Sequence, residues 1–326
     1  MKYKVSIIME AYNEENTALA EHPEAVEHLL RQDFPLHQVE LVLVGSKSQL
    51  ADWKEVPAAW NRFGQVRVVP MDSAQPHYWE QKNFGAQIAL GEIVAWVDSD
   101  VKAEPTWLRS IVSAIDAGAD VSVGPSMYAH SWFHPHSPLM LAAASISWGF
   151  VLAYNSEPEK PLPNALLSHN SGIRREVALR IPYRTGQASF QSSVFYFDLV
   201  QNHVKVTYQP EQRAAHQMTL WWWLSRRHFR SGWETYNGRA AHTLWPRIAA
   251  LEKVRWIEPI ILRGGMVLRD SRHWFRYRRV TNVGLAKAWL MLPLVVAASA
   301  AARAAEAIGM YSWMLAPKST ARQARF

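Results

Sequence analysis

The first 120 residues alternate between two hydrophobic patterns, and this alternation constrains the fold more than any other feature of the chain. Short runs rich in β-branched and apolar residues predict strands at Val5–Met9, Val39–Val44 and Ile93–Val97. Apolar residues at helical spacing predict helices at 24–30, 81–90 and 107–117. Strands that alternate with helices build a mostly parallel sheet covered by helices. We therefore expect an α/β fold whose ligands gather at the carboxyl ends of the strands.

Length and composition exclude several classes of protein. The chain has 326 residues, of which 49% are hydrophobic and 19% are charged, so it can bury a substantial core. It contains no cysteine. Disulfide scaffolds, cysteine-ligated zinc, iron–sulfur clusters and thiol catalysis are therefore excluded.

The net charge of +7 is distributed unevenly along the chain. Residues 1–120 carry 10 basic and 18 acidic side chains, whereas residues 213–280 carry 14 basic and 4 acidic ones. The basic, tryptophan-rich second half indicates a surface that faces an anionic partner. Nucleic acid, anionic lipid and phosphorylated substrates all fit that description. The apolar part of Met1–Met9 is too short for a signal-peptide core, which predicts a cytoplasmic protein.

A long apolar segment lies near the C-terminus. Residues 288–302 are 15 uncharged residues that include Pro293 and are bracketed by Lys287 and Arg303. A membrane-spanning helix needs about 20 apolar residues. The segment therefore fits a helix in the bilayer interface, or a core helix, better than a span. We expect one domain over 1–240 and a basic, apolar helical extension over 241–326 with peripheral membrane contact.

The strand predicted at Ile93–Val97 ends in two carboxylates, Asp98 and Asp100, separated by Ser99. Removing two carboxylates from water is costly unless a cation lies between them. Mg²⁺ and Mn²⁺ prefer oxygen ligands and keep positions open for a substrate such as a diphosphate. The pattern is therefore typical of a metal–diphosphate site. The alternative interpretation is a strand-end turn with solvated acids.

Four segments in order extend this pattern, and they cover about residues 3–235. The segments are Val5–Glu15, which contains Ala11-Tyr12-Asn13-Glu14; Lys82–Asp100, which contains Lys82-Asn83 and Ala89-Leu90-Gly91-Glu92; Tyr208–His216; and Trp223–Gly232. With these motifs the chain resembles the family 2 glycosyltransferases with the GT-A fold. The resemblance implies a Rossmann-like, mostly parallel central sheet flanked by helices, a nucleotide-sugar donor and a divalent metal.

The resemblance also implies roles for individual residues. Those expected to hold the nucleotide are Ala11, Tyr12, Glu14, Lys82, Asp98 and Arg227. Those expected to bind the metal or the diphosphate are Asp98, Asp100 and His216. A neutral imidazole can complete an oxygen-rich site, and a lysine can offset the developing charge of a diphosphate. The alternatives are a structural histidine at 216 and a solvated arginine at 227.

The chain departs from the family pattern at two positions. An acid usually follows the second strand, whereas here Gly45-Ser46 follows, and Ser46 would have to hold the base or ribose by hydrogen bonding. The usual general base would fall near Gln191-Ser192, and the nearest carboxylate is Asp198, which is the predicted catalytic residue. The alternatives are an acceptor that needs no base and a catalytically reduced homologue. A general base contributes about 10²–10⁴-fold, so its loss would slow transfer without abolishing donor binding.

These observations predict an inverting glycosyltransferase of the hexosyltransferase type. It would move a sugar from a nucleotide-sugar, expected to be UDP-linked, to an acceptor hydroxyl with Mn²⁺ or Mg²⁺. The expected acceptor is a carbohydrate or a lipid-linked molecule on the inner face of the membrane. One alternative is a nucleotide-sugar-binding homologue without transferase activity. Another is a nucleic-acid-binding protein, but no nucleic-acid motif accompanies the basic helix and the acidic first third would repel a polyanion.

Overall fold

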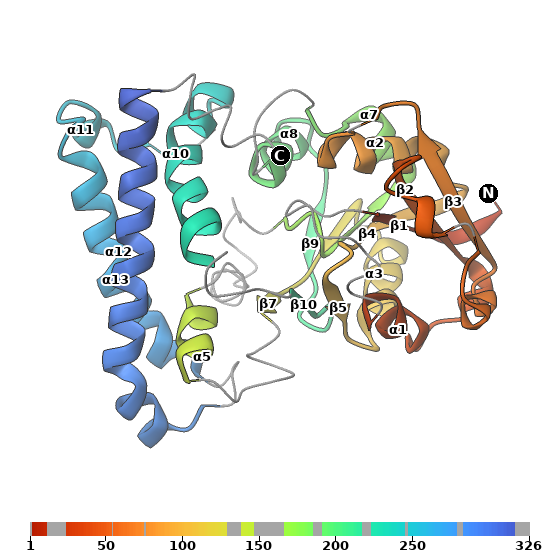
Figure 1. Cartoon of the computed structure of the whole chain (residues 1–326), viewed down its shortest axis with the longest axis horizontal. Helices are drawn as coiled ribbons and strands as arrows, with labels where there is room; N and C mark the ends of the chain where they lie inside the picture. Colours follow the sequence, from red (N-terminus) through yellow and green to blue (C-terminus); the bar gives the residue numbers. More distant parts are fainter. Residues whose placement is uncertain are drawn as a thin grey trace.

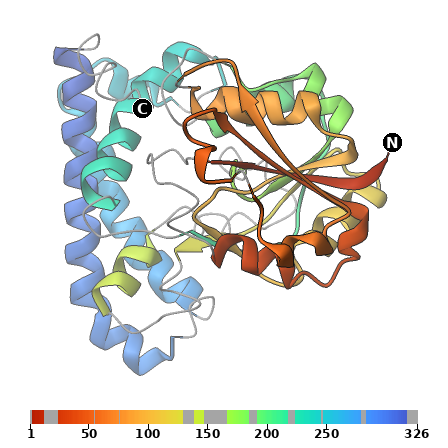
Figure 2. The ribbon, with the colours of Figure 1, turned by 45° about the vertical axis from the view of Figure 1, so that its right-hand side comes forward.

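Two regions stand side by side in the computed structural model of the chain: an α/β region built on a seven-stranded sheet, and a layer of helices (Figure 1). The structure describes residues 2–11, 24–53, 55–74, 76–128, 138–146, 166–184, 191–216, 223–244, 247–278 and 283–316. Figure 2 shows from a second direction that the helical layer stands beside the α/β region.

The main sheet has the strand order β3-β2-β1-β4-β8-β6-β9. Its strands are β1 (Tyr3–Glu10), β2 (Val39–Ser46), β3 (Gln65–Met71), β4 (Gly91–Trp96), β6 (Val121–Val123), β8 (Ser171–Arg174) and β9 (Val206–Tyr208). The first four strands in this order are mutually parallel, and β8 runs antiparallel to both β4 and β6. The predicted α/β class with a mostly parallel sheet is therefore confirmed.

Side chains of β1 alternate between two hydrophobic cores on opposite faces of the sheet. Ile7 and Met9 pack with α1 (Glu24–Leu30) and α3 (Trp107–Asp116), whereas Ile8 packs with α2 (Tyr78–Ile88), α7 (Arg175–Arg180) and α8 (Gln191–Gln201). Because both faces are covered, β1 is buried to its end. The acid that ends it, Glu10, must therefore find partners inside the protein.

A second, three-stranded sheet continues from the end of β4. It consists of β5 (Val101–Ala103), β10 (Ala214–His216) and β7 (Ser126–Tyr128), in the order β5-β10-β7. β5 begins directly after Asp100, and β10 pairs antiparallel with it so that His216 lies opposite Val101. This pairing carries His216 to the end of β4, although the two segments are far apart in the sequence.

The helical layer contains α5 (Pro138–Ser145), α10 (Phe229–Ala241), α12 (Glu258–Tyr277) and α13 (Leu285–Leu315). A π-helical turn, η5 (Trp223–His228), leads into α10. Short helices complete the described elements: η2 (Leu36–Gln38), η3 (Ala51–Trp53), η4 (Ala58–Arg62) and α11 (Ala249–Glu252). α5 and α10 both pack on α13. The proposed division of the chain at residue 240 stays a prediction.

α13 is longer than the sequence suggested. It has 31 residues, contains Pro293 and continues through Arg303 and Glu306 to Leu315. Among the described residues it is the one helix that length and composition would allow to cross a membrane. The helix continues past the apolar segment because Arg303 and Glu306 are buried against the protein and do not end it.

Candidate functional site

Two acidic side chains lie at the carboxyl edge of the main sheet. Glu10 is the last residue of β1, and Asp98 follows β4 after Val97. β1 and β4 are parallel neighbours, so their carboxyl ends lie side by side. Both side chains are buried. Two carboxylates removed from water at one place require a cation nearby.

Lys82 of α2 lies between these carboxylates. Its Nζ donates to Asp98 Oδ1 at 2.8 Å and lies 3.4 Å from Glu10 Oε2. Tyr78, one helical turn earlier, donates its hydroxyl to the carboxylate of Asp98, with its oxygen 2.7 and 2.8 Å from Oδ1 and Oδ2. The ammonium of Lys82 lies 4.6 Å from the centre of the Tyr78 ring. One face of α2 therefore holds the carboxylate of Asp98 in place.

The charges in this cluster are not balanced. Burial acts to raise the pKa of Asp98, but the charge of Lys82 and the hydrogen bonds from Lys82 and Tyr78 lower it overall. Burial and the negative charge of Asp98 raise the pKa of Glu10 well above its ordinary value, and Asp100 adds to this. Burial acts to lower the pKa of Lys82, but Asp98 and Glu10 raise it overall. A single lysine thus faces more carboxylates than its charge can neutralise.

Two histidines approach Asp98 from other elements. Asp98, His169 and His216 each offer one ligand atom, and these three atoms lie within 4.8 Å of one another. All three residues are buried. Nε2 of His216, which ends β10, is 3.5 Å from Asp100 Oδ2. His169 precedes β8, and its Nε2 is 2.7 Å from Ser126 Oγ. Carboxylate oxygens and imidazole nitrogens in such a group are the donors that a divalent transition metal accepts.

The electrostatic surroundings keep His169 neutral. Burial is the main cause that lowers the pKa of His169 to about 3. The charge of Asp98 acts to raise this pKa, whereas the charges of His216, Lys82 and Arg227 lower it further. A neutral imidazole is the form that binds a metal. The positive charge of Arg227 also acts on His169. Arg227 belongs to η5 and donates a hydrogen bond to Ser231 of α10.

Comparison with known proteins identifies the family. Residues 6–179, more than half of the chain, match glycosyl transferase family 2. The chain belongs to glycosyl transferase family 2. The predicted transferase class is therefore confirmed, and nucleotide-sugar glycosyl transfer is the chemistry of this class.

Three proteins illustrate how far the similarity extends. A Haloferax volcanii protein, glucosyl-dolichyl phosphate glucuronosyltransferase, is 25% identical over 281 residues, which cover 79% of this chain and 83% of that protein. The mannosyltransferase PcManGT from Pyrobaculum calidifontis, solved with GDP-Man and Mn²⁺, superposes with a TM-score of 0.55 at 14% identity and covers 98% of this chain and 88% of its own. S. aureus TarS 1–349 in complex with UDP-GlcNAc gives a TM-score of 0.48 at 15% identity, covering 96% and 92%. The likeness to the mannosyltransferase confirms the predicted GT-A fold.

Two other predicted nucleotide-binding residues of this glycosyltransferase lie at the same sheet edge. Ala11 follows β1, is buried, and donates its backbone N–H to Val44 O at 2.8 Å. Ser46 ends β2, and its hydroxyl lies 2.9 Å from Ser48 Oγ and accepts from the backbone N–H of Gln49 at 3.2 Å. Ser46 therefore stabilises the turn that follows β2. Two further predicted residues, Tyr12 and Glu14, lie outside the described residues.

Asp198, the predicted base, lies in α8 and is engaged by other side chains. Arg184 donates two hydrogen bonds to its carboxylate, one of them from Nε to Oδ2 at 2.9 Å. His242 Nε2 is 3.5 Å from Asp198 Oδ1. A carboxylate in a bidentate ion pair must give up part of that contact before it accepts a proton. The role of Asp198 as a base stays a prediction.

Sequence reasoning missed three residues of the cluster: Glu10, Tyr78 and His169. Glu10 had a signal, since it is an acid at the end of an apolar strand, as Asp98 is. Tyr78 was missed because the helix was predicted to begin at residue 81, whereas α2 begins one turn earlier. His169 has no local signal, because only the tertiary fold brings it to Asp98.

Proposed function

We propose that this glycosyltransferase moves a hexose from a nucleotide-sugar, UDP-linked, to an acceptor hydroxyl, with inversion at the anomeric carbon and with a divalent metal. The observation that supports this best is the buried group Asp98, His169 and His216 beside Lys82. A diphosphate leaving group gains negative charge as the sugar–oxygen bond breaks. Cations fixed in a buried site stabilise that charge most effectively.

The metal would be held by Asp98 and His216, as the sequence predicts, together with His169. Asp100, beside His216, is the other predicted ligand. The residues fit a divalent ion because the carboxylates supply negative charge and the imidazole of His169 is neutral. A mixed set of nitrogen and oxygen donors favours Mn²⁺ over Mg²⁺, which prefers oxygen alone. When bound, the ion would neutralise charge on the diphosphate.

The protein's own cations would complete diphosphate binding. The raised pKa of Lys82 keeps its ammonium charged, and the charge of Arg227 helps to lower the pKa of His169. We assign these two side chains to the phosphates of the donor. Around the base and ribose we place the remaining predicted residues: Ala11, Tyr12, Glu14 and Ser46.

Acceptor activation is the step for which the chain departs from its family's pattern. Inversion requires that the acceptor lose its proton as its oxygen attacks the anomeric carbon. We propose Asp198 as the base, which requires Arg184 to release it. The ion pair between these residues, together with Gln191-Ser192 at the usual position of the acid, favours a second candidate function. In that function the chain binds a nucleotide-sugar without transferring it.

We place the acceptor, a carbohydrate or a lipid-linked molecule, at the inner face of the cytoplasmic membrane. The Haloferax volcanii relative is named for a dolichyl phosphate. Residues 213–280 carry 14 basic and 4 acidic side chains, and α13 has the length and composition of a membrane helix. We propose peripheral contact with anionic lipid and no nucleic-acid partner.

The proposed reaction is tested by incubating the full chain with Mn²⁺ and a panel of UDP- and GDP-sugars, and measuring release of the nucleoside diphosphate. We expect turnover of at least one donor by the wild type, its loss in Asp100→Ala, and its retention in Asp116→Ala. Asp116 is an exposed aspartate that pairs with Lys4, so it controls for the loss of one carboxylate. Donor binding without turnover in the wild type would instead support the second candidate function.

Asp198 is tested separately once an acceptor is found. If it is the base, Asp198→Asn lowers kcat by about 10²-fold or more with little change in the KM for the donor. An unchanged kcat would assign Asp198 to the structural pair with Arg184.

A further inference from the structure

The helices α12 and α13 depart in part from the usual arrangement of polar and apolar side chains in a soluble protein. Three charged residues, Asp270 of α12 and Arg303 and Glu306 of α13, are buried, whereas several large apolar residues of the same helices are exposed. A helix on the surface of a soluble protein buries its apolar stripe and exposes its charges. In a membrane environment the preference is inverted, and charged side chains face the protein interior and pair with one another.

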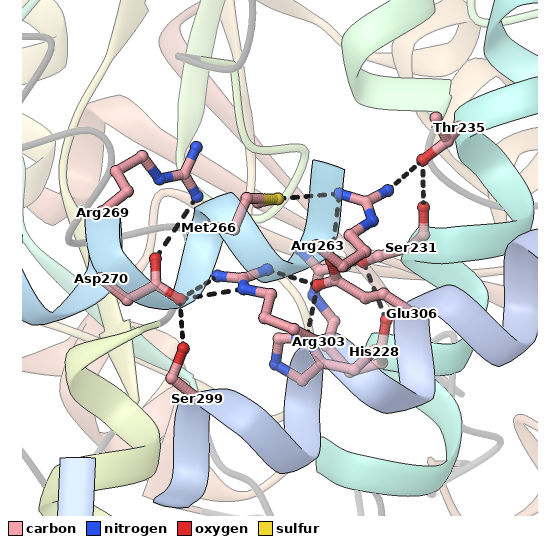
Figure 3. Close-up of polar contacts among 11 residues, drawn as sticks. His228, Ser231, Thr235, Arg263, Met266, Arg269, Asp270, Ser299, Arg303 and Glu306 are labelled. Atoms are coloured by element: carbon pink, nitrogen blue, oxygen red, sulfur yellow. Dashed lines mark hydrogen bonds and ion pairs between the residues drawn. The ribbon is translucent and has the colours of Figure 1, made fainter. Parts of the chain in front are cut away.

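The inward side of the two helices holds a buried ionic network (Figure 3). Arg303 of α13 donates to Asp270 of α12 from Nε at 2.9 Å and from Nη2 at 2.7 Å, and it also binds Glu306. Arg263 Nη1 lies 3.1 Å from Glu306 Oε2, and His228 of η5 lies 2.7 Å from Glu306 Oε1. The charges in the middle of α13 are therefore paired with opposite charges inside the protein.

The outward side of the same helices is apolar along most of its length. Of the large hydrophobic residues that are exposed in the described part of the chain, 14 of 18 lie after residue 240. Leu268 of α12 and Leu290 of α13 are the most exposed, at 76% and 82%. Smaller apolar residues of α13 fill the same side: Ala286, Pro293, Ala297, Ala300, Ala301 and Ala304. Contiguous apolar surface of this kind marks an interaction site.

The helices α12 and α13 run antiparallel to each other, so their exposed sides form one surface. Trp256, just before α12, stacks on Tyr311 near the end of α13 with ring centres 6.5 Å apart. Phe275 near the end of α12 lies 4.6 Å from Trp289 near the start of α13. We call the exposed side of this pair the outer apolar face and define it by Ile260, Ile261, Leu268, Trp289, Leu290 and Ile308.

Only one side of α13 is available to lipid, because the other side is fixed to α10. A Cβ added to Gly232 of α10 would lie 1.8 Å from Glu306 O, and one added to Gly309 of α13 would lie 2.0 Å from Phe229 O. Such close backbone approach requires glycine at both positions. A helix surrounded by lipid would lose these contacts, whereas a helix lying flat on the bilayer keeps them.

Basic residues lie at both ends of the outer apolar face. Lys253 and Arg255 are exposed before α12, and Arg272, Arg276 and Lys287 are exposed where α12 ends and α13 begins. Long basic side chains reach lipid phosphates while their neighbours contact the acyl region. Apolar surface bounded by basic residues is the composition of a helix in the bilayer interface.

We infer that the outer apolar face docks flat on a bilayer that contains anionic phospholipid, with α12 and α13 in the interface plane and the ionic network turned toward the protein. This inference refines the membrane contact in the proposed function and rests on it. It assigns the contact to one face of two helices and leaves the sheet and its donor site in the aqueous phase.

The test is co-sedimentation of the full chain with vesicles of phosphatidylcholine, with and without phosphatidylglycerol. We expect the wild type to bind the anionic vesicles and the double variant Leu268→Glu/Leu290→Glu to lose about tenfold or more in affinity, because it puts two charges in the apolar contact. The matched control is Leu90→Glu/Leu179→Glu, which makes the same changes at two exposed leucines of the α/β region and should bind as the wild type does.

A second measurement uses the absence of cysteine from the chain. Leu290→Cys and Leu179→Cys each provide a single site for an environment-sensitive fluorophore. Anionic vesicles should shift the emission of the label at 290 to the blue and leave that at 179 unchanged. Equal shifts at both positions, or vesicle binding by Leu268→Glu/Leu290→Glu that matches the wild type, would overturn the inference.

Two further outcomes are distinguishable. If the wild type is a dimer by light scattering, ignores vesicles, and becomes a monomer in Leu268→Glu/Leu290→Glu, the outer apolar face joins two copies and the inference is wrong. Release of nucleoside diphosphate from the donor, measured without vesicles, should be the same in this variant and in the wild type. Absence of turnover together with normal vesicle binding would contradict the proposed reaction and leave the docking face intact.

Discussion

The molecule contains two buried clusters of charge, and they are built differently. At the edge of the sheet, Lys82 faces Glu10 and Asp98, with Asp100 adding further negative charge. In the helical layer, Asp270 and Glu306 both bind Arg303, and each also contacts a second arginine. The first cluster has an excess of carboxylates, and the second has a cation for every carboxylate.

Two glutamates show the effect of this difference. Glu10 and Glu306 are almost equally buried, at 1% and 2% exposure. Burial and the charge of Asp98 raise the pKa of Glu10 well above its ordinary value. Burial also acts to raise the pKa of Glu306, but Arg303 and Arg263 lower it well below that value. Buried carboxylates with enough cations hold a fold together, whereas carboxylates in excess mark a place that receives a cation or a cationic complex.

The largest expected effect is on stability in the balanced cluster. Arg303→Met removes the cation shared by Asp270 and Glu306, and breaking a buried ion pair in this way costs about 3–5 kcal/mol. Chemical denaturation would measure this as a fall in the free energy of unfolding. Arg269→Met is the control, because Arg269 binds the same aspartate from a partly exposed position, where a pair contributes about 0–1 kcal/mol. Equal losses in the two variants would contradict the distinction between a shared buried cation and a peripheral one.

The next largest expected effect is on enzymatic activity, and it comes from the cluster at the edge of the sheet, which has an excess of carboxylates. We expect Asp100→Asn to lower kcat/KM by about 10²–10³-fold, since removing one preorganised charge group at a reacting centre costs about 2.7–4 kcal/mol. Its unfolding free energy without metal should change by less than about 1 kcal/mol, because the loss of one carboxylate relieves repulsion among those that remain. Steady-state kinetics measure the fall in kcat/KM, and chemical denaturation of the same sample measures the change in unfolding free energy. A large loss of stability would show that the sheet-edge acids are structural, as those of the helical layer are.

Metal binding separates the two clusters further. Mn²⁺ at about 100 times its Kd should add about 2.7 kcal/mol to the free energy of unfolding, seen as a rise in Tm by differential scanning fluorimetry. His169→Gln should remove most of this rise, because His169 belongs to the proposed ligand group. His37→Gln, at an exposed histidine, should keep it. An undiminished rise in His169→Gln would exclude His169 as a ligand.

The smallest effect is a dependence on pH that comes from Glu306. Its pKa in the folded protein is below the ordinary 4.5, so its ionised form stabilises the fold above that pH. This contribution should be constant above about pH 6 and should fall by at most about 1.4 kcal/mol per pH unit as the pH drops below about 4.5. The groups that face Glu306 are Arg303, Arg263 and His228.

The measurement is the difference in unfolding free energy between the wild type and Glu306→Gln across the acid range, since the other acids titrate in both proteins. The wild type should lose its advantage as the pH falls. A difference that does not change with pH would contradict the charge-based stabilisation of the helical layer.

The local sequence pattern was sufficient to predict those parts of the protein whose sequence signal lies within a few neighbouring residues. The strands β1, β2 and β4 and the helices α1 and α3 were predicted from hydrophobic period alone, because strand and helix periods depend on neighbouring residues. Asp98 was found because a strand ended in acids, and parallel strands bring their carboxyl ends to one edge. Motifs then placed Lys82 and His216 at the same edge, where the structure has them.

Only the tertiary structure determined which other side chains those residues contact. His169 reaches Asp98, and Arg184 engages Asp198, through contacts that depend on the path of the whole chain and leave no periodic trace in the sequence. The same holds for α13. Its sequence shows an apolar helix with three charged residues, but only the packing of α10 and α12 shows that Arg303 and Glu306 point inward and Leu290 outward. Composition sets how apolar a helix is, whereas the elements packed around it decide which side remains exposed to a partner.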